Sequence, residues 1–385
     1  MPFPQIPFNR VYLTGDEERN VIDAIRSRSH SGNRDYGSKC ITLLEERFSF
    51  LSVFLTPSCT SAMEMGAILA NLTPGDEVIL PSYTFSSTVN AVVLRGARPV
   101  FCDVDPSTMN IDPNLIDQLV SPKTKMIIPI DYAGVPCDID SIMEIANRRQ
   151  LLVMQDAAQS LNSYHSDNRA CGSVPHLAAF SFHETKNITC GEGGALVIND
   201  PNLIDRAHIV QEKGTDRSLV LKGLQNKYGW SDIGSSFLLS DILAAMLLAQ
   251  LEKIEEITAK RRKITDAYNH LCEKYVVQGC IQTPCPPPGV VINHHAFWVI
   301  FDSEKNQTLF LKELRARDIH SYIGYVSLHS YEMGLKMGYK PEDVPITEDI
   351  SKRIVRLPLY TDLAENGLQR CVQEIGNIFE GIYGF

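Results

Sequence analysis

The stretch Ala178-Ala-Phe-Ser-Phe-His-Glu-Thr-Lys186 passes from a short apolar run into polar residues and ends in a lysine. A second apolar run, Leu151-Leu-Val-Met-Gln155, leads in the same way into Asp156. Short, uninterrupted apolar runs are typical of strands buried inside a parallel sheet. We therefore expect Asp156 and Lys186 to emerge at the carboxyl ends of strands of one sheet, which is where α/β proteins bind ligands.

A lysine and an aspartate at such an edge are the two groups that pyridoxal phosphate (PLP) requires of a protein. The lysine forms a Schiff base with the cofactor and later carries protons, while the aspartate keeps the pyridine nitrogen protonated so that the ring accepts electrons. Taken singly, most lysines are solvated and most aspartates at strand ends are turn or cap residues. The neighbouring motifs Asp156-Ala-Ala-Gln159 and Cys190-Gly-Glu-Gly-Gly194 favour the cofactor.

The length and composition of the chain indicate how many domains and which kinds of partner to expect. The chain has 385 residues with a net charge of −10 and exceeds what one hydrophobic core usually serves, so two domains are expected. The acidic balance offers no broad basic surface for nucleic acid, and a small-molecule partner is expected instead. No apolar run approaches the roughly 18 residues of a spanning helix, and the N-terminus lacks a signal peptide pattern, so we expect a cytoplasmic protein with no membrane partner.

Cysteine and histidine patterns do not indicate a metal. The ten cysteines are scattered without a Cys-x-x-Cys pair, which favours small buried side chains over disulfides or metal ligands. His183-Glu184 resembles half of a zinc-protease motif, but Asn187 stands where the second histidine would be. No metal site is expected.

Apolar runs alternate with helical patterns from about residue 55 to 215, as in a mostly parallel sheet sandwiched by helices. Ser240 is expected to cap one long helix that continues toward Tyr268 and bridges two domains. Beyond a proline-rich stretch, a strand over 296–301 and a helix near 309–317 predict a smaller α+β domain. The expected division is a large domain over 1–250 and a small one over 251–385. The predicted strands of the large sheet are Glu77–Leu80, Pro99–Asp103, Lys125–Pro129, Leu151–Gln155, Ala178–Phe182 and Ala195–Ile198.

Seven motifs follow one another in an order that resembles the DegT/DnrJ/EryC1 family of sugar aminotransferases. The resemblance covers most of residues 1–260 and implies a fold type I PLP enzyme that acts on nucleotide-linked keto sugars, with a mostly parallel seven-stranded sheet. The motifs are Thr56-Pro-Ser-Cys-Thr-Ser-Ala62, Pro74–Val78, Pro81–Phe85, Asp103–Asp105, Asp156–Gln159, Ser181–Asn187 and Gly191–Gly194.

Several residues receive cofactor-binding roles. Ser58, Cys59 and Thr60 precede an apolar helical run and would cradle the phosphate with hydroxyl and N–H groups at a helix N-terminus; a simple N-cap would explain only one of them. The resemblance further implies that Ser181 contacts the phosphate and that Gln159 donates to the phenolic oxygen of the ring. Phe85 would stack on the outer face of the ring, although by itself it reads as a core residue.

The chain departs from the family pattern at two positions. Leu238 stands where many members have an asparagine that reaches the phosphate of the neighbouring subunit, and we expect Ser235 or Ser236 to replace it. Asp131 stands where the family has a histidine near the sugar, and it either contacts a hydroxyl or caps a loop. His329 matches a family histidine near the substrate, although an isolated histidine is more often a structural hydrogen-bonding residue.

Three narrower motifs resemble the branch that aminates dTDP-4-keto-6-deoxyglucose at C4, giving a dTDP-4-amino-4,6-dideoxygalactose or -glucose. They imply a homodimer with active sites at the subunit interface, L-glutamate as donor, and a role in O-antigen and lipopolysaccharide biosynthesis. Amination at C3 and a non-catalytic PLP-fold regulator are the alternatives. Relatives that remove a sugar hydroxyl are disfavoured, because they carry histidine where this chain has Lys186. The narrower motifs are Phe182–Asn187, Glu212–Thr215 and Asp232–Ser236.

Overall fold

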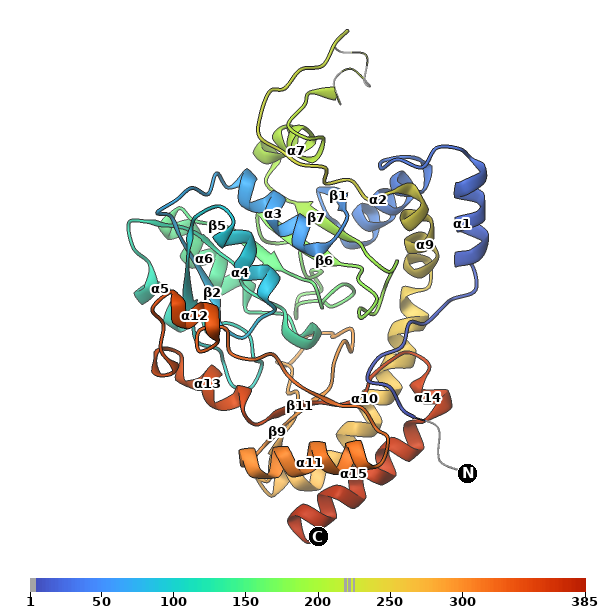
Figure 1. Cartoon of the computed structure of the whole chain (residues 1–385), viewed down its shortest axis with the longest axis vertical. Coiled ribbons are helices and arrows are strands. Elements are labelled where there is room, and N and C mark those ends of the chain that lie inside the picture. The colour runs from blue at the N-terminus through green and yellow to red at the C-terminus, as the bar shows by residue number, and fades with distance from the viewer. Residues whose placement is uncertain (1–4, 218–219, 221–222, 224–225) are drawn as a thin grey trace.

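The computed structural model describes residues 5–217, 220, 223 and 226–385. Their strands form one sheet of seven strands and one of four, each with its own helices (Figure 1). Among the helices in these ranges, none has the length and apolar character that crossing a membrane requires. Of the ten cysteines, all of them free, Cys280 and Cys285 are partly or fully exposed and the others are buried, as predicted.

The seven-stranded sheet confirms the predicted α/β fold. Its strands lie in the order β1-β7-β6-β5-β4-β2-β3, and β7 runs antiparallel to both neighbours while the other pairs are parallel. All six predicted strands form within two residues of their expected bounds, and β1 was missed. The strands are β1 Ser52–Thr56, β2 Glu77–Pro81, β3 Arg98–Cys102, β4 Thr124–Ile127, β5 Leu152–Asp156, β6 Leu177–Ser181 and β7 Gly194–Ile198.

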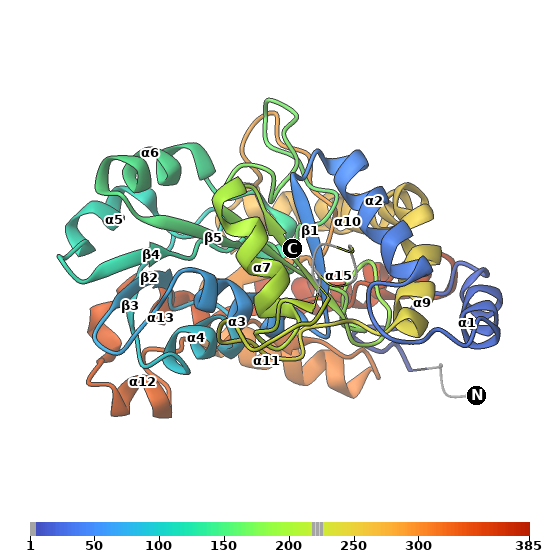
Figure 2. The same ribbon diagram turned by 90° about the horizontal axis from the view of Figure 1, so that it is seen from above.

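Helices cover both faces of this sheet because its strands are apolar on both sides. In β1, Val53 packs with α2 and α9 on one face, and Phe54 packs with α3 and α7 on the other. This alternation follows from the two-residue period of a strand. Figure 2 shows α2, α5 and α6 on one side and α3 and α4 on the opposite side. The helices are α1 Glu17–Arg26, α2 Asp35–Phe48, α3 Cys59–Leu69, α4 Ser86–Val93, α5 Pro113–Leu119, α6 Ile139–Arg149, α7 Ile204–Gln211 and α9 Asp241–Glu252.

The four-stranded sheet is antiparallel, in the order β10-β11-β9-β8. Its core joins aromatic side chains of α10, α11 and α15, and Ile6 of the N-terminal segment packs there too. Ile6 also pairs with Ile319. The division into two domains at residue 250 stays a prediction. It would assign Ile6 to the large domain, although Ile6 packs in the core of the small sheet. The elements are α10 Ile254–Val277, β8 Ile281–Gln282, β9 Trp298–Phe301, α11 Glu304–Ala316, β10 Tyr322–Ile323, α12 Glu332–Lys336, α13 Pro345–Ser351, β11 Ile354–Arg356, α14 Leu363–Asn366 and α15 Leu368–Tyr383.

The long helix predicted after Ser240 is instead two helices. The hydroxyl of Ser240 does cap α9 by accepting a hydrogen bond from the Leu243 N–H. The helix is interrupted at Lys253, whose φ of −111° and ψ of 15° are not helical. Leu251 on one side of the break packs under the large sheet, whereas Tyr268 belongs to the core of the small sheet. Ile257, beyond the break, still packs in the core of the large sheet, so the chain passes to the core of the small sheet farther along α10, before Ile264 (Figure 1).

Candidate active site

A cavity of about 360 Å³ lies at the carboxyl edge of the large sheet, between that edge and the small sheet. The segments that follow β1, β2, β5 and β6 line it from the large sheet. The predicted edge is therefore the one that carries the cavity. Its lining includes Ser58, Cys59, Thr60, Phe85, Asp156, Gln159, Ser181 and Lys186 from this side, and Phe8, His295, Tyr325 and Arg356 from the other.

Asp156, the last residue of β5, is buried beside the cavity with neutral hydrogen-bond donors. Its Oδ2 accepts from the Thr88 hydroxyl at 2.7 Å and its Oδ1 accepts from the Ala158 N–H at 3.2 Å. Burial raises the pKa of Asp156, although these hydrogen bonds and the charge of Lys186 oppose the rise. Within the ranges that the structure describes, the carboxylate forms no ion pair. A positively charged group of a ligand, such as a protonated pyridine nitrogen, would supply the missing partner.

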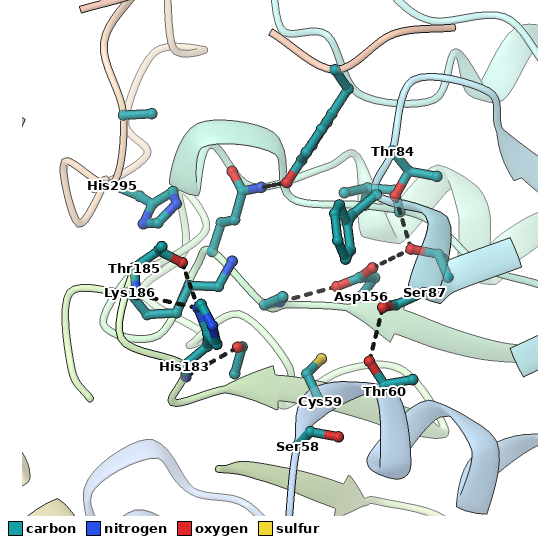
Figure 3. A pocket seen from close by; sticks show the side chains of 18 of the residues that line it. Ser58, Cys59, Thr60, Thr84, Ser87, Asp156, His183, Thr185, Lys186 and His295 are labelled. Carbon is teal, nitrogen blue, oxygen red and sulfur yellow. Dashed lines mark hydrogen bonds between the residues drawn. The ribbon is translucent and has the colours of Figure 1, made fainter. Parts of the chain in front are cut away.

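Lys186 follows β6, the neighbour of β5, and points into the cavity from the side facing Asp156 (Figure 3). Burial lowers the pKa of Lys186, and the neighbouring Cys59 and Asp156 side chains oppose this shift. The amine makes no hydrogen bond or ion pair with any other described part of the chain. A desolvated and unengaged amine is well suited to bond covalently to an aldehyde, because less free energy is needed to deprotonate it.

The N-terminus of α3 lies at the base of the cavity (Figure 3). Ser58 is its N-cap, with a hydroxyl that accepts from the Ser61 N–H at 3.0 Å. A Cβ on Gly194 would lie 2.4 Å from backbone atoms of Ser58 and Cys59, so only glycine lets the first turn of α3 lie on β7. Burial raises the pKa of the Cys59 thiol well above its usual range, which keeps it uncharged. This positive helix end fits a phosphate group.

Gln159 and Phe85 also reach the cavity as predicted. The Gln159 Oε1 accepts from the Ala133 N–H at 2.7 Å, which turns its Nε2 toward the Tyr325 hydroxyl at 2.8 Å. Phe85 is 58% exposed and directly precedes α4. An exposed phenylalanine on a cavity wall is available to a flat ring, which core packing would not allow. Together with Asp156, Lys186 and the end of α3, these residues fit PLP.

Asp131 and His329, both predicted to contact the substrate, lie outside the cavity. Asp131 is fully buried. Its carboxylate accepts hydrogen bonds from the Cys137 N–H and from the side chains of Gln155 and Ser160, so it caps the loop after β4. His329 is also fully buried, with Nδ1 2.7 Å from the Ser82 hydroxyl and Nε2 3.2 Å from the Pro341 carbonyl. The polar atoms of both side chains are engaged inside the protein, and we assign neither residue to the substrate.

Ser235 and Ser236 are exposed and do not line the cavity of their own chain. They belong to the segment between α7 and α9, whose described residues extend away from the large sheet (Figure 1). The Ser235 N–H donates to the Val210 carbonyl and fixes the base of this segment. The two serines therefore lie on the outside of this chain, and their contact with the cofactor phosphate stays a prediction.

Sequence reasoning missed the residues that reach the cavity from the small sheet: His295, Tyr325 and Arg356. The His295 Nδ1 lies 3.0 Å from the Asn187 Oδ1, and the Asn187 Nδ2 donates to a backbone carbonyl, so the neutral ring carries its proton on Nδ1. Burial lowers the pKa of His295 well below its usual range. The available sequence signals were an arginine inside the apolar run Ile354–Leu359 and a histidine pair just before β9.

The comparisons with known proteins agree with this geometry. The model of the DegT/DnrJ/EryC1/StrS aminotransferase family matches residues 39–376. The uncharacterized protein MJ1066 of Methanocaldococcus jannaschii is 31% identical over 378 residues, which are 94% of this chain and 95% of that protein. The spore coat polysaccharide biosynthesis protein SpsC of Bacillus subtilis is 29% identical over 383 residues, which are 96% of each chain. The structure of the aminotransferase TlmJ from Streptoalloteichus hindustanus superposes with a TM-score of 0.89 at 25% identity, covering 98% of this chain and 100% of its own.

The family match spans nearly the whole chain, and the cavity holds the lysine, the aspartate and the helix N-terminus that its cofactor needs. The chain belongs to the DegT/DnrJ/EryC1/StrS aminotransferase family and is a PLP-dependent aminotransferase.

Proposed function

We propose that this enzyme transfers an amine from L-glutamate to C4 of dTDP-4-keto-6-deoxyglucose, acting as a cytoplasmic homodimer in the biosynthesis of surface polysaccharide sugars of the O-antigen type. The observation that carries the catalytic part is the position of Asp156, which ends β5, and of Lys186, which follows the neighbouring parallel strand β6, because both face one cavity (Figure 3). When bound there, PLP supplies an electron-accepting ring that stores the amine between the two half-reactions.

Each residue of the cavity has a defined task in this reaction. The Nζ of Lys186 would hold the cofactor at rest, and once released it would carry a proton between the reacting carbon of the substrate and the cofactor. Its lowered pKa makes this amine a base nearer to neutral pH than an exposed lysine. Asp156 keeps a proton on the pyridine nitrogen, and the end of α3 with Ser58 and Ser181 holds the phosphate. Phe85 covers one face of the ring and Gln159 donates to its phenolic oxygen.

The choice of sugar rests on sequence motifs and one relative. Phe182–Asn187, Glu212–Thr215 and Asp232–Ser236 resemble the branch that aminates C4 of the dTDP-linked keto sugar. The name of the B. subtilis relative refers to spore coat polysaccharide biosynthesis, which supports a surface polysaccharide as the destination. The axial or equatorial configuration of the new amine depends on which sugar face meets the cofactor.

A homodimer is supported by the exposed segment between α7 and α9. Trp230 is 83% exposed and Tyr228 is 58% exposed, so large apolar side chains are exposed on the same segment as Ser235 and Ser236. In our proposal this segment packs on a second copy and brings the two serines to the phosphate in the partner's cavity. Light scattering of the purified enzyme should give twice the mass of one chain, and Trp230→Asp should shift the measured mass toward that of a single chain.

The decisive assay follows nitrogen from donor to product. The purified enzyme is incubated with PLP, ¹⁵N-labelled glutamate and dTDP-4-keto-6-deoxyglucose, and the nucleotide sugar is examined by NMR. We expect the label on C4, and the same spectrum gives the configuration at that carbon. In a parallel incubation with dTDP-3-keto-6-deoxyglucose, label on C3 of that sugar and none on the 4-keto sugar would move the proposal to the C3-aminating class. Consumption of glutamate without amination of either sugar would refute the proposed acceptor. Lys186→Ala is the control that should give no labelled sugar.

A further inference from the structure

Arg356 brings a positive charge into the cavity from the small sheet. It is the last residue of β11 and pairs with Tyr322 on one side and Trp298 on the other, which fixes its backbone inside the sheet. Its guanidinium carbon lies 5.3 Å from the ring centres of both Phe8 and Tyr325. Two rings thus hold the planar group without using its N–H donors, since the contact is with the ring faces.

The donors of this guanidinium are not satisfied by the protein. Its Nε is buried without a hydrogen-bond partner, and Arg356 forms no ion pair within the residues that the structure describes. Arg261, by comparison, is buried but donates to the carbonyls of His295 and Leu359. Leaving a buried charged donor unpaired costs free energy, and a planar arginine fork matches a carboxylate or a phosphate. Arg356 is therefore ready for an anionic group of a ligand.

The position of Arg356 distinguishes between the anions that enter this cavity. Arg356 lines the same cavity as Lys186 and His295, and its charge lowers the pKa of both, so it lies near the amine that reacts. In an amino acid donor the carboxylate is bonded directly to the reacting carbon. In the keto sugar the reacting carbon lies across the ring from the carbon that carries the diphosphate. The phosphate of the cofactor has its own site at the N-terminus of α3.

We propose that Arg356 binds the α-carboxylate of the amino donor and thereby selects amino acids over other amines. The inference rests on the proposed function, because it takes C4, the carbon across the ring from the diphosphate, as the reacting carbon of the sugar. During the donor half-reaction the guanidinium pairs with the carboxylate, and during the acceptor half-reaction it faces an uncharged sugar ring. Substitution of Arg356 should therefore slow the two half-reactions to very different degrees.

The test measures the half-reactions separately on the full-length, cofactor-loaded enzyme. Glutamate is mixed with the PLP form, and the keto sugar nucleotide with the aminated form, while the absorbance of the cofactor is followed. In Arg356→Gln we expect kcat/KM for glutamate to fall roughly 10- to 150-fold, as expected for one charged hydrogen-bonded pair, and the acceptor half-reaction to stay near the wild-type rate. Arg356→Lys should recover part of the loss, because it keeps the charge but not the fork.

A binding measurement supplies a readout that does not depend on turnover. 2-Methylglutamate has no hydrogen on its α-carbon, so it binds but cannot pass on its amine. Its dissociation constant should rise by the same factor as kcat/KM falls in Arg356→Gln. Arg10→Gln is the matched control, because Arg10 lies on the segment next to Phe8 but pairs with Asp362 outside the cavity. It should leave both quantities unchanged.

Each other outcome has a defined meaning. An equal loss in both half-reactions would overturn the proposal in favour of a structural role, and a loss confined to the sugar half-reaction would make Arg356 a diphosphate ligand. If the wild-type enzyme reacts with glutamate but not with this keto sugar, the proposed acceptor fails while the donor test stands. Should Arg356→Gln not fold, Arg356→Lys is compared with the wild type on glutamate and on 4-aminobutyrate, which lacks the α-carboxylate. A loss with glutamate alone supports the proposal, and equal losses refute it.

Discussion

Replacing Asp156 with asparagine removes a charge from the cavity while changing almost nothing in shape. The asparagine oxygen can still accept from the Ala158 N–H, and its amide remains beside the Thr88 hydroxyl. Lys186, Ser58 and the end of α3 are untouched, so the cofactor should still bind. What is lost is the carboxylate that would hold a proton on the pyridine nitrogen.

The size of the effect follows from the burial of this carboxylate. Breaking a buried ion pair by removing one partner costs about 3–5 kcal/mol, which corresponds to a fall in rate of about 10²- to 10⁴-fold if the whole interaction is needed in the transition state. We expect the glutamate half-reaction of Asp156→Asn, followed by cofactor absorbance, to slow by this factor. The PLP content of the purified variant should remain close to that of the wild type.

The cofactor-free enzyme gives an independent check through its stability. Burial raises the pKa of Asp156 above its ordinary value of 3.8, so the folded protein binds this proton more tightly than the unfolded chain. The free energy of unfolding therefore falls as the pH rises from 3.8 upward through the raised pKa. Asp156→Asn should lack this contribution and should gain stability relative to the wild type over that range in urea unfolding.

A matched control distinguishes the loss of a charge beside the cofactor from the loss of any buried carboxylate. Asp103 is also buried, but its carboxylate accepts from the backbone of Ile346 and Thr347, away from the cavity. Asp103→Asn should lower stability and leave the glutamate half-reaction near the wild-type rate. The reasoning would be refuted if Asp156→Asn transferred amines at the wild-type rate, or if it lost the cofactor as completely as a lysine variant.

Three further substitutions test other parts of the structure. Gly194→Ala places a Cβ 2.4 Å from the Cys59 nitrogen, so it should cost about 1–3 kcal/mol in urea unfolding and weaken cofactor retention; unchanged retention would contradict the position of α3. Burial alone would raise the pKa of Glu348, but hydrogen bonds from Ser330 and its neighbours lower it to about 2. Glu348→Gln should therefore be less stable than the wild type above pH 4.5, and the two should become equally stable as the pH falls toward 2. A constant difference across that range would refute this. Asp131→Asn should lose about 1–3 kcal/mol of stability and keep its KM for the keto sugar, and a raised KM with normal stability would return this residue to the substrate site.

The residues that the sequence predicted well are those set by local structure. Asp156 and Lys186 each follow an uninterrupted apolar strand, so their position at the sheet edge follows from the strands alone. Ser58 is an N-cap, and its role depends on the next three residues of the chain. The break at Lys253 lies within one core, which Leu251 and Ile254 on its two sides both join, so the apolar periodicity continues across it and does not report it.

The residues that sequence reasoning misplaced depend on distant contacts. Asp131 and His329 lie close to residues of the cavity in the chain, but hydrogen bonds such as that from Ser82 turn their side chains into the protein. Arg356 and Tyr325 enter the cavity from a sheet that forms more than a hundred residues later than Lys186. Only the docking of the small sheet on the large one shows which of these side chains faces the cofactor site.

The central claim is that the amine of Lys186 is the group to which the cofactor is bonded. Borohydride reduction of the PLP-loaded enzyme, followed by digestion and peptide mass mapping, makes that bond permanent and locates it. We predict a single reduced adduct on the peptide that contains Lys186, and its absence from Lys186→Ala. An adduct on any other lysine of the wild-type enzyme would contradict the account.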